Sequence, residues 1–166
     1  EEIDLGKDMY GRSRFGKGFV EWVNGNTQGT SYGNGASMRI SPVGYLFDTE
    51  KDIIENARLA TIPSHNSEEA VYCATTIALM IYYFRNGWSK EEVYKKLKLQ
   101  ANYIPFTKFN MTCGTTIGNC LYAIYHSTSF EDAIRKILVM GGDTDTNACI
   151  VGSVAESIYG MTSDMP

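Results

Sequence analysis

Two acids near the carboxyl end of the chain are the residues best suited to do chemistry. The stretch from Gly141 to Asn147 reads Gly-Gly-Asp-Thr-Asp-Thr-Asn and lies between two apolar helical patterns. Because one residue separates Asp143 from Asp145, a tight turn can aim both carboxylates at a shared point, and Thr146 adds a hydroxyl oxygen. Such hard oxygen donors suit Mg²⁺, Mn²⁺ or Ca²⁺. The stretch predicts one half of a metal site.

The same residues are also typical of an ordinary helix N-cap. A helix is expected to begin at about Thr146, and Asp or Asn side chains before a helix commonly accept hydrogen bonds from its first N–H groups. Those N–H groups also favour an anion, such as a substrate phosphate. Taken alone, the stretch fits capping and metal binding about equally well, so other parts of the chain must decide.

A second stretch, residues 28–39, is dense in small and polar side chains. It reads Gln-Gly-Thr-Ser-Tyr-Gly-Asn-Gly-Ala-Ser-Met-Arg, which predicts a loop. Its glycines permit close approach of the backbone to a ligand, and Tyr32 offers a flat apolar face. A simple surface loop is the alternative, and composition alone favours it.

His65 is a third candidate, because it precedes the longest expected helix. Ser67 is a good N-cap for that helix, so His65 lies just upstream of its positive end and can reach a cleft. A polar loop histidine is the alternative, and the local pattern slightly favours it.

The elements that must position these residues are helices. Apolar residues recur at helical spacing, strand signals are nearly absent, and Ser67, Ser89 and Ser129 are N-cap candidates. Helices are expected over residues 19–23, 52–61, 67–87, 89–99, 115–126, 130–140 and 148–159, with a break or short bend at 40–45. In the helix over 130–140, Ile134, Ile137, Leu138 and Val139 are expected to face inward. The predicted fold is all-α, a compact orthogonal bundle of about six or seven helices.

Composition excludes several classes of function. The 166 residues, 43% of them hydrophobic, fit one domain. A net charge of −4 argues against nucleic acid as a direct partner, and the most apolar run, residues 77–84, is too short to cross a membrane. The four cysteines, three in expected helices and Cys113 in a loop, form no C-x-x-C pair, which indicates reduced, mostly buried thiols in a cytoplasmic protein.

Three stretches together resemble the ADP-ribosylglycohydrolase family, which includes the dinitrogenase reductase-activating glycohydrolase. They are residues 31–42, the Ser-His-Asn of 64–66, and residues 141–148, in matching order and spacing. The Phe-Glu-Asp-Ala-Ile-Arg of 130–135 is also similar to the family. The resemblance therefore covers almost the whole chain.

The resemblance implies an all-α enzyme that holds two Mg²⁺ ions, with Mn²⁺ as a possible substitute. Such enzymes hydrolyse the N- or O-glycosidic bond between ADP-ribose and a protein side chain or related acceptor. Asp143, Asp145 and Thr146 are then expected to be metal ligands, and the two aspartates are expected to act through the ions.

The resemblance also implies a partner, ADP-ribose or an ADP-ribosylated protein. Its site is expected to be lined by Gly29, Thr30, Ser31, Tyr32, Gly33, Asn34 and Gly35, with His65 as a further contact. Backbone N–H groups and small hydroxyls would bind the diphosphate, which requires no basic patch. The alternative is a noncatalytic ADP-ribose-binding or structural member of the same fold.

The chain departs from the family pattern in the remaining acids. The family carries a Gly-Asp-x-x-Gly stretch with a following Glu, and a Thr-Asp-Asp triplet, and neither is found here; residues 48–50 and 162–164 are poor substitutes. We expect residues 1–166 to be a single, incomplete domain lacking its N-terminal portion, with weak metal binding and little catalysis alone. A natural noncatalytic paralogue and a site completed by another polypeptide are the alternatives.

Overall fold

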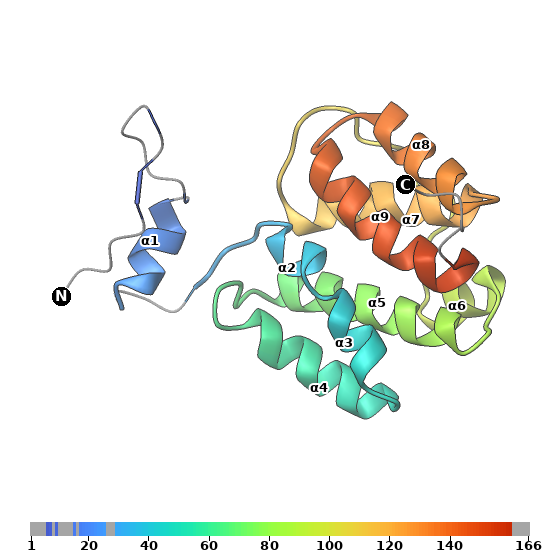
Figure 1. Cartoon of the computed structure of the whole chain (residues 1–166), viewed down its shortest axis with the longest axis horizontal. Coiled ribbons are helices and arrows are strands. Elements are labelled where there is room, and N and C mark those ends of the chain that lie inside the picture. The colour runs from blue at the N-terminus through green and yellow to red at the C-terminus, as the bar shows by residue number, and fades with distance from the viewer. Residues whose placement is uncertain (1–5, 8, 10–14, 16, 26–28, 161–166) are drawn as a thin grey trace.

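The computed structural model describes residues 6–7, 9, 15, 17–25 and 29–160 (Figure 1). Those residues form nine helices, joined by connections that carry isolated backbone bridges. The all-α expectation is therefore confirmed. Within the same residues, every helix is either too short or too polar to cross a lipid bilayer.

The helix α5 (Glu68–Arg85) lies at the centre of the bundle. It contacts α2 (Gly35–Met38), α3 (Ser41–Leu46), α4 (Glu50–Thr61), α6 (Lys90–Lys96), α7 (Cys113–His126) and α9 (Thr144–Tyr159). Eleven of its side chains are buried, which matches its nearly continuous apolar sequence.

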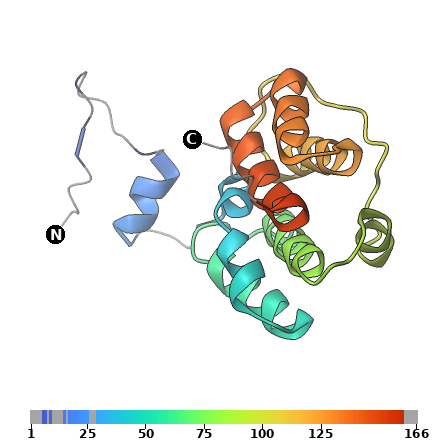
Figure 2. The ribbon, with the colours of Figure 1, turned by 45° about the vertical axis from the view of Figure 1, so that its right-hand side comes forward.

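The other helices pack on two sides of α5. The helices α3 and α4 lie along one side, while α7, α8 (Phe130–Met140) and α9 pack on one another on the other side (Figures 1 and 2). By contrast, α1 (Lys17–Val23) lies apart from this bundle in both views.

Three predicted helix starts are confirmed by their hydrogen bonds. Ser67 accepts from Ala70 N, Ser129 accepts from Asp132 N, and Ser89 forms a complete capping box with Glu92. Each serine satisfies a donor that the first turn of a helix otherwise leaves unpaired.

The region 28–45 is more helical than its composition predicts. The expected loop over 28–39 contains α2, because Ala36 and Ser37 are buried against the bundle. The expected break at 40–45 is α3, in which Pro42 occupies the first turn, where its missing N–H costs nothing. A Cβ on Gly44 would lie 2.7 Å from Ala78 O, so this glycine permits close packing of α3 on α5.

Two smaller expectations are wrong. Cys113 begins α7 rather than lying in a loop, and its thiol is buried, as are those of Cys73 and Cys120. In α8, Ile137 is buried, whereas Leu138 is 48% and Val139 is 88% exposed, because consecutive helical residues turn by about 100° away from the packed face.

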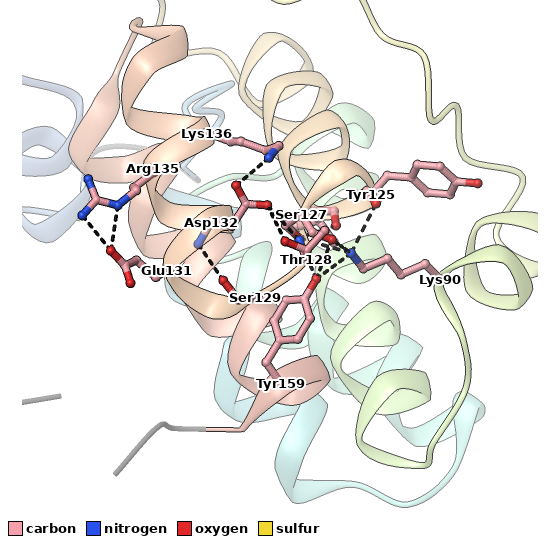
Figure 3. A network of polar contacts seen from close by, with 11 residues as sticks. Lys90, Tyr125, Ser127, Thr128, Ser129, Glu131, Asp132, Arg135, Lys136 and Tyr159 are labelled. Carbon is pink, nitrogen blue, oxygen red and sulfur yellow. Dashed lines mark hydrogen bonds and ion pairs between the residues drawn. The ribbon is translucent and has the colours of Figure 1, made fainter. Parts of the chain in front are cut away.

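A polar network, here called the lysine network, ties the carboxyl ends of α7 and α9 to α6 (Figure 3). Lys90 Nζ donates to Ser127 O at 2.5 Å, to Tyr125 O at 3.2 Å and to Tyr159 Oη at 2.7 Å. The Ser127 hydroxyl in turn donates to Ile124 O at 2.8 Å. The ammonium therefore satisfies carbonyls at the negative end of α7.

Candidate functional site

The stretch from Gly29 to Gly35, here called the cradle, is paired on one side with the connection between α4 and α5. Asn66 N donates to Gly29 O at 2.7 Å, and Ser31 N donates to Ser64 O at 3.3 Å. A Cβ on Gly29 would lie 2.3 Å from both Cα and O of Ser64. Only glycine allows the two backbones to approach this closely.

The other side of the cradle is held by the start of α7. Asn34 N donates to Met111 O at 2.8 Å, and Cys113 N donates to Tyr32 O at 3.0 Å. The buried Cys113 thiol also donates to Gly33 O at 2.9 Å. Two segments far apart in sequence therefore fix the backbone of a stretch that has few apolar side chains of its own.

His65 lies against the glycines of the cradle. A Cβ on Gly35 would be 3.4 Å from His65 Nε2, and one on Gly33 would be 3.6 Å away. Arg39 Nη2 lies 2.9 Å from His65 Nδ1; because a guanidinium only donates, Nδ1 is the acceptor. Burial and then the Arg39 charge lower the pKa of His65 to about 4. The ring is neutral at pH 7, with its Nε2–H directed at the cradle.

The acidic turn, residues 141–147, does not behave as a simple cap. The helix α9 begins at Thr144, close to the expected start, and Asp143 occupies its N-cap position without a side-chain capping bond. Instead, the buried Asp143 Oδ2 accepts from Asn34 Nδ2 at 2.7 Å. The capping alternative therefore fails for Asp143.

Asp145 and Thr146 complete the turn. The pKa of Asp145 lies below its ordinary value, first because the Asp143 side chain is within hydrogen-bonding reach and then because Thr146 N donates to its carboxylate. Asp145 is exposed, whereas Asp143 and Thr146 are buried. One carboxylate therefore faces solvent and the other lies next to it in the protein.

Glycines bring the connection between α6 and α7 onto the acidic turn. Gly141 and Gly142 have φ values of +77° and +81°. A Cβ on Gly141 would lie 3.1 Å from Thr107 O. The connection that supports the cradle through Met111 therefore also packs against the turn.

The structure thus brings most predicted residues into two joined groups. His65 faces Gly33 and Gly35, and Asn34 links the cradle to Asp143. The other predicted cradle residues are less enclosed: Tyr32 is 62% exposed, and Ser31 Oγ is engaged within the cradle, accepting from Gly33 N at 3.1 Å. The link through Asn34, and the contributions of Thr116, Cys113 and Arg39, were not apparent from the sequence, which shows no spacing rule for them.

The donor set fits one side of a site for a hard cation. It consists of two carboxylates and a hydroxyl from four consecutive residues, and Mg²⁺ is commonly held by one or two carboxylates together with substrate phosphate and water. Among the described residues, no group of three or more His, Cys, Asp or Glu side chains is placed to hold a metal ion.

A cavity borders the cradle on the side of α5. Its volume is about 290 Å³, and it is lined by Arg58, Asn66, Ser67, Glu68, Val71 and Tyr72. Ser67 Oγ donates to Ser31 O at 3.4 Å, so the cavity and the cradle share a wall. The cavity therefore lies next to the cradle.

Comparison with known proteins shows the family of the chain. The family model of ADP-ribosylglycohydrolase matches residues 6–166, and the chain belongs to that family. It is 25% identical to ADP-ribosylarginine hydrolase Tri1 of Pseudomonas putida (strain GB-1), covering 89% of this chain and 43% of the relative. It is also 25% identical to the ADP-ribosyl-(dinitrogen reductase) glycohydrolase of Rhodospirillum rubrum, covering 81% of this chain and 48% of the relative.

A solved structure, described as an ADP-ribosylglycohydrolase-related protein complex, has the same fold. Its TM-score is 0.67 at 23% identity, covering 78% of this chain and 50% of that one. The chain therefore spans about half the length of the relatives that it matches.

Proposed function

We propose that this chain carries the ADP-ribose-binding part and one side of the metal site of an ADP-ribosyl glycohydrolase. The reaction would be Mg²⁺-dependent hydrolysis of the glycosidic bond between ADP-ribose and an acceptor. The observation that carries the proposal is the 2.7 Å bond from Asn34 Nδ2 to Asp143 Oδ2, because it joins a glycine-rich cradle to a pair of carboxylates. The anionic diphosphate of ADP-ribose would need the cradle, and the glycosidic bond that is hydrolysed would need the carboxylates close by.

The cradle would bind the diphosphate and the adjoining ribose. Gly35 begins α2, so its N–H has no acceptor within that helix, and His65 presents a neutral N–H beside it. Backbone and imidazole donors bind phosphate oxygens without a cluster of lysine or arginine. This agrees with a net charge of −4 and the absence of a basic run in the sequence.

Asp143, Asp145 and Thr146 would hold Mg²⁺, or Mn²⁺ in its place. When bound, the ion would supply positive charge that orients the ribose hydroxyls and activates water. Glycosides hydrolyse through an oxocarbenium-like transition state in which the acceptor leaves with a proton and water adds to the anomeric carbon. The carboxylates of the turn would also favour the positive charge that develops on the sugar.

The expectation that residues 1–166 form a single, incomplete domain is also part of the proposal. We propose that the chain forms part of one ADP-ribosylglycohydrolase domain, whose remaining metal ligands come from a segment that precedes this sequence. The acceptor is proposed to be a protein side chain, so that the substrate would be an ADP-ribosylated protein. ADP-ribosylarginine is the first probe to use, because one relative is named for that substrate.

The test is release of ADP-ribose from an ADP-ribosylated protein, measured with and without Mg²⁺. We expect little release by this chain alone and metal-dependent release by a chain extended at its N-terminus, abolished in both Asp143→Asn and Asp145→Asn. Equal release from the extended wild type and Asp143→Asn would contradict the proposal. Robust Mg²⁺-dependent turnover by residues 1–166 alone would contradict the proposed missing segment.

A noncatalytic member of the same fold is the second candidate. It is favoured by the observation that the described residues gather only two acids at the turn. Calorimetric binding of ADP-ribose with no release from any ADP-ribosylated substrate, even by the extended chain, would establish it. Absence of both ADP-ribose and Mg²⁺ binding would exclude both the enzyme and a noncatalytic ADP-ribose-binding member.

A further inference from the structure

Both side-chain N–H groups of Asn34 are engaged inside the protein. Its Nδ2 donates to Asp143 Oδ2 at 2.7 Å and to Thr116 Oγ1 at 3.0 Å, and the residue is buried. An asparagine amide has two N–H donors, so these two acceptors use both of them. The NH₂ group is therefore directed away from any ligand in the cradle.

The backbone of Asn34 is equally fixed. Its N–H donates to Met111 O at 2.8 Å, and its carbonyl accepts from Ser37 N at 2.9 Å and Met38 N at 3.1 Å. Thr116 lies in α7, on a packed face of the bundle, and is also buried. Both ends of the link from Thr116 through Asn34 to Asp143 are thus held by regular structure.

The link satisfies a buried carboxylate with a neutral donor. Among the ion pairs formed by the described residues, none includes Asp143. A lysine or arginine in the place of Asn34 would bring a positive charge to the carboxylate and oppose binding of a cation. An amide instead orients the carboxylate without bringing a positive charge to it.

We propose that Asn34 and Thr116 are positioning residues for the metal ion. Asn34 fixes Oδ2 of Asp143, which leaves Oδ1 to face the ion, and Thr116 fixes the amide of Asn34. The inference rests on the proposed function, and it changes the expected role of Asn34. The residue acts through Asp143 rather than by contacting the diphosphate.

The test is the affinity of the 166-residue chain for Mn²⁺, measured by calorimetry or by electron paramagnetic resonance. Removal of a hydrogen bond that orients a metal ligand commonly weakens metal binding by about 10- to 100-fold. We expect a loss in this range for Asn34→Ala, and about a 10-fold loss for Thr116→Val, which keeps the shape of the side chain. Thr116→Ser retains the acceptor and should bind Mn²⁺ within about 2-fold of wild type.

Thr76→Val is the matched control. Thr76 is another buried helical threonine, but its hydroxyl donates to Tyr72 O at 2.8 Å within α5. It should change stability about as much as Thr116→Val without changing Mn²⁺ affinity. A Thr116→Val protein that folds, loses stability like Thr76→Val and keeps wild-type Mn²⁺ affinity would overturn the inference.

Binding of ADP-ribose without metal separates the two possible roles of Asn34. A positioning residue predicts unchanged metal-free affinity in Thr116→Val and Asn34→Ala. A drop of 10-fold or more in Asn34→Ala alone would assign Asn34 to the substrate and overturn the inference.

Failure of the proposed function would look different. Wild-type protein that binds no Mn²⁺ at millimolar concentration would overturn the metal part of that function together with the positioning role. Binding that is lost in Asp143→Asn but intact in Asn34→Ala and Thr116→Val would overturn the positioning role alone.

Discussion

The two ends of α9 carry polar clusters of opposite kinds. Tyr159, its last residue, belongs to the lysine network, where Lys90 Nζ, Ser127 Oγ and Tyr159 Oη bond to one another and to carbonyls. At the other end, about 24 Å away along a helix of 16 residues, Asp143 and Asp145 place two carboxylates side by side. The first cluster balances donors with acceptors, and the second has an excess of acceptors.

The difference separates a cluster whose donors and acceptors are matched from one that has unmatched acceptors. Asn147 Oδ1, also in the acidic turn, is buried without a hydrogen-bond partner, whereas the lysine network leaves no such atom among the described residues. A matched network stabilises the native state, and an unmatched one costs free energy until something binds. The two ends should therefore respond to mutation in opposite ways.

The largest expected effect is that of Asp143→Ala on function. In a protein with the complete metal site, we expect metal-dependent hydrolysis to fall by about 1,000-fold or more, equivalent to roughly 4 kcal/mol of transition-state free energy. Unfolding by urea should show a change of less than about 1 kcal/mol, because the deletion also removes one of two neighbouring negative charges. A large loss of stability would show that Asp143 stabilises the fold, and it would contradict the proposed difference between the acidic turn and the lysine network.

Lys90→Met should have the reverse effect. It removes the charged donor shared by Ser127 O, Tyr125 O and the Ser127 hydroxyl and leaves Tyr159 Oη as the remaining side-chain partner of Ser127, which should lower the free energy of unfolding by about 2 to 4 kcal/mol. Mn²⁺ and ADP-ribose affinities should remain within about 2-fold of wild type, since α9 separates the two clusters. The control is Lys95→Met on the exposed face of α6, which should change stability by less than about 0.5 kcal/mol.

Gly29→Ala tests the close approach of the cradle to Ser64, and its expected effect is smaller. The new Cβ would overlap the backbone of Ser64, so the two segments must separate, at a cost of about 1 to 3 kcal/mol. ADP-ribose affinity should fall together with stability, and calorimetry and urea unfolding measure the two effects. Gly18→Ala in α1, where a Cβ meets nothing within 4 Å, is the control; it should leave ADP-ribose affinity unchanged and should not lower stability.

The smallest expected effect concerns pH and His65. Its pKa in the folded state, about 4, lies below the ordinary value of 6.5, so the unfolded chain binds more protons between these pH values. Stability should therefore be lost as pH falls from 6.5 to 4 and be insensitive to this group above 6.5. The full difference corresponds to about 3 kcal/mol, and solvent around the half-buried ring reduces it to about 1 to 2 kcal/mol.

Urea unfolding at pH 7, 5.5 and 4.5 measures this effect. His65→Gln should flatten the dependence. An unchanged slope in His65→Gln would show that other groups cause the acid sensitivity.

Helices with their own capping signals were predictable from the sequence. Ser67, Ser89 and Ser129 mark starts that depend on local chemistry, and the structure confirms all three. The helices α2 and α3 were missed because they form through packing against α5 in a stretch of small residues. Local composition does not encode that packing.

The residues of the candidate site also fall into those that local sequence suggests and those that only folding brings together. Gly29 and the pair Asp143 and Asp145 were candidates because of their types and spacing, and the family resemblance favoured a site over a surface loop or a helix cap. Thr116 and Arg39 were missed, since each acts on a partner brought near only by folding: Thr116 on Asn34, and Arg39 on His65. Nothing in a single sequence links residues that lie 82 positions apart.

The backbone hydrogen bonds on the two sides of the cradle determine how fast its amide hydrogens exchange with solvent. The amide hydrogens of Ser31 and Asn66 exchange with solvent only when the cradle separates from the α4–α5 connection, and those of Asn34 and Cys113 only when it separates from the start of α7. Hydrogen exchange should therefore show two different rates within the cradle, one for Ser31 and one for Asn34. A bound nucleotide that spans the cradle should slow both pairs to a common rate. The exchange rates of these four amides would then measure the fraction of protein with nucleotide bound.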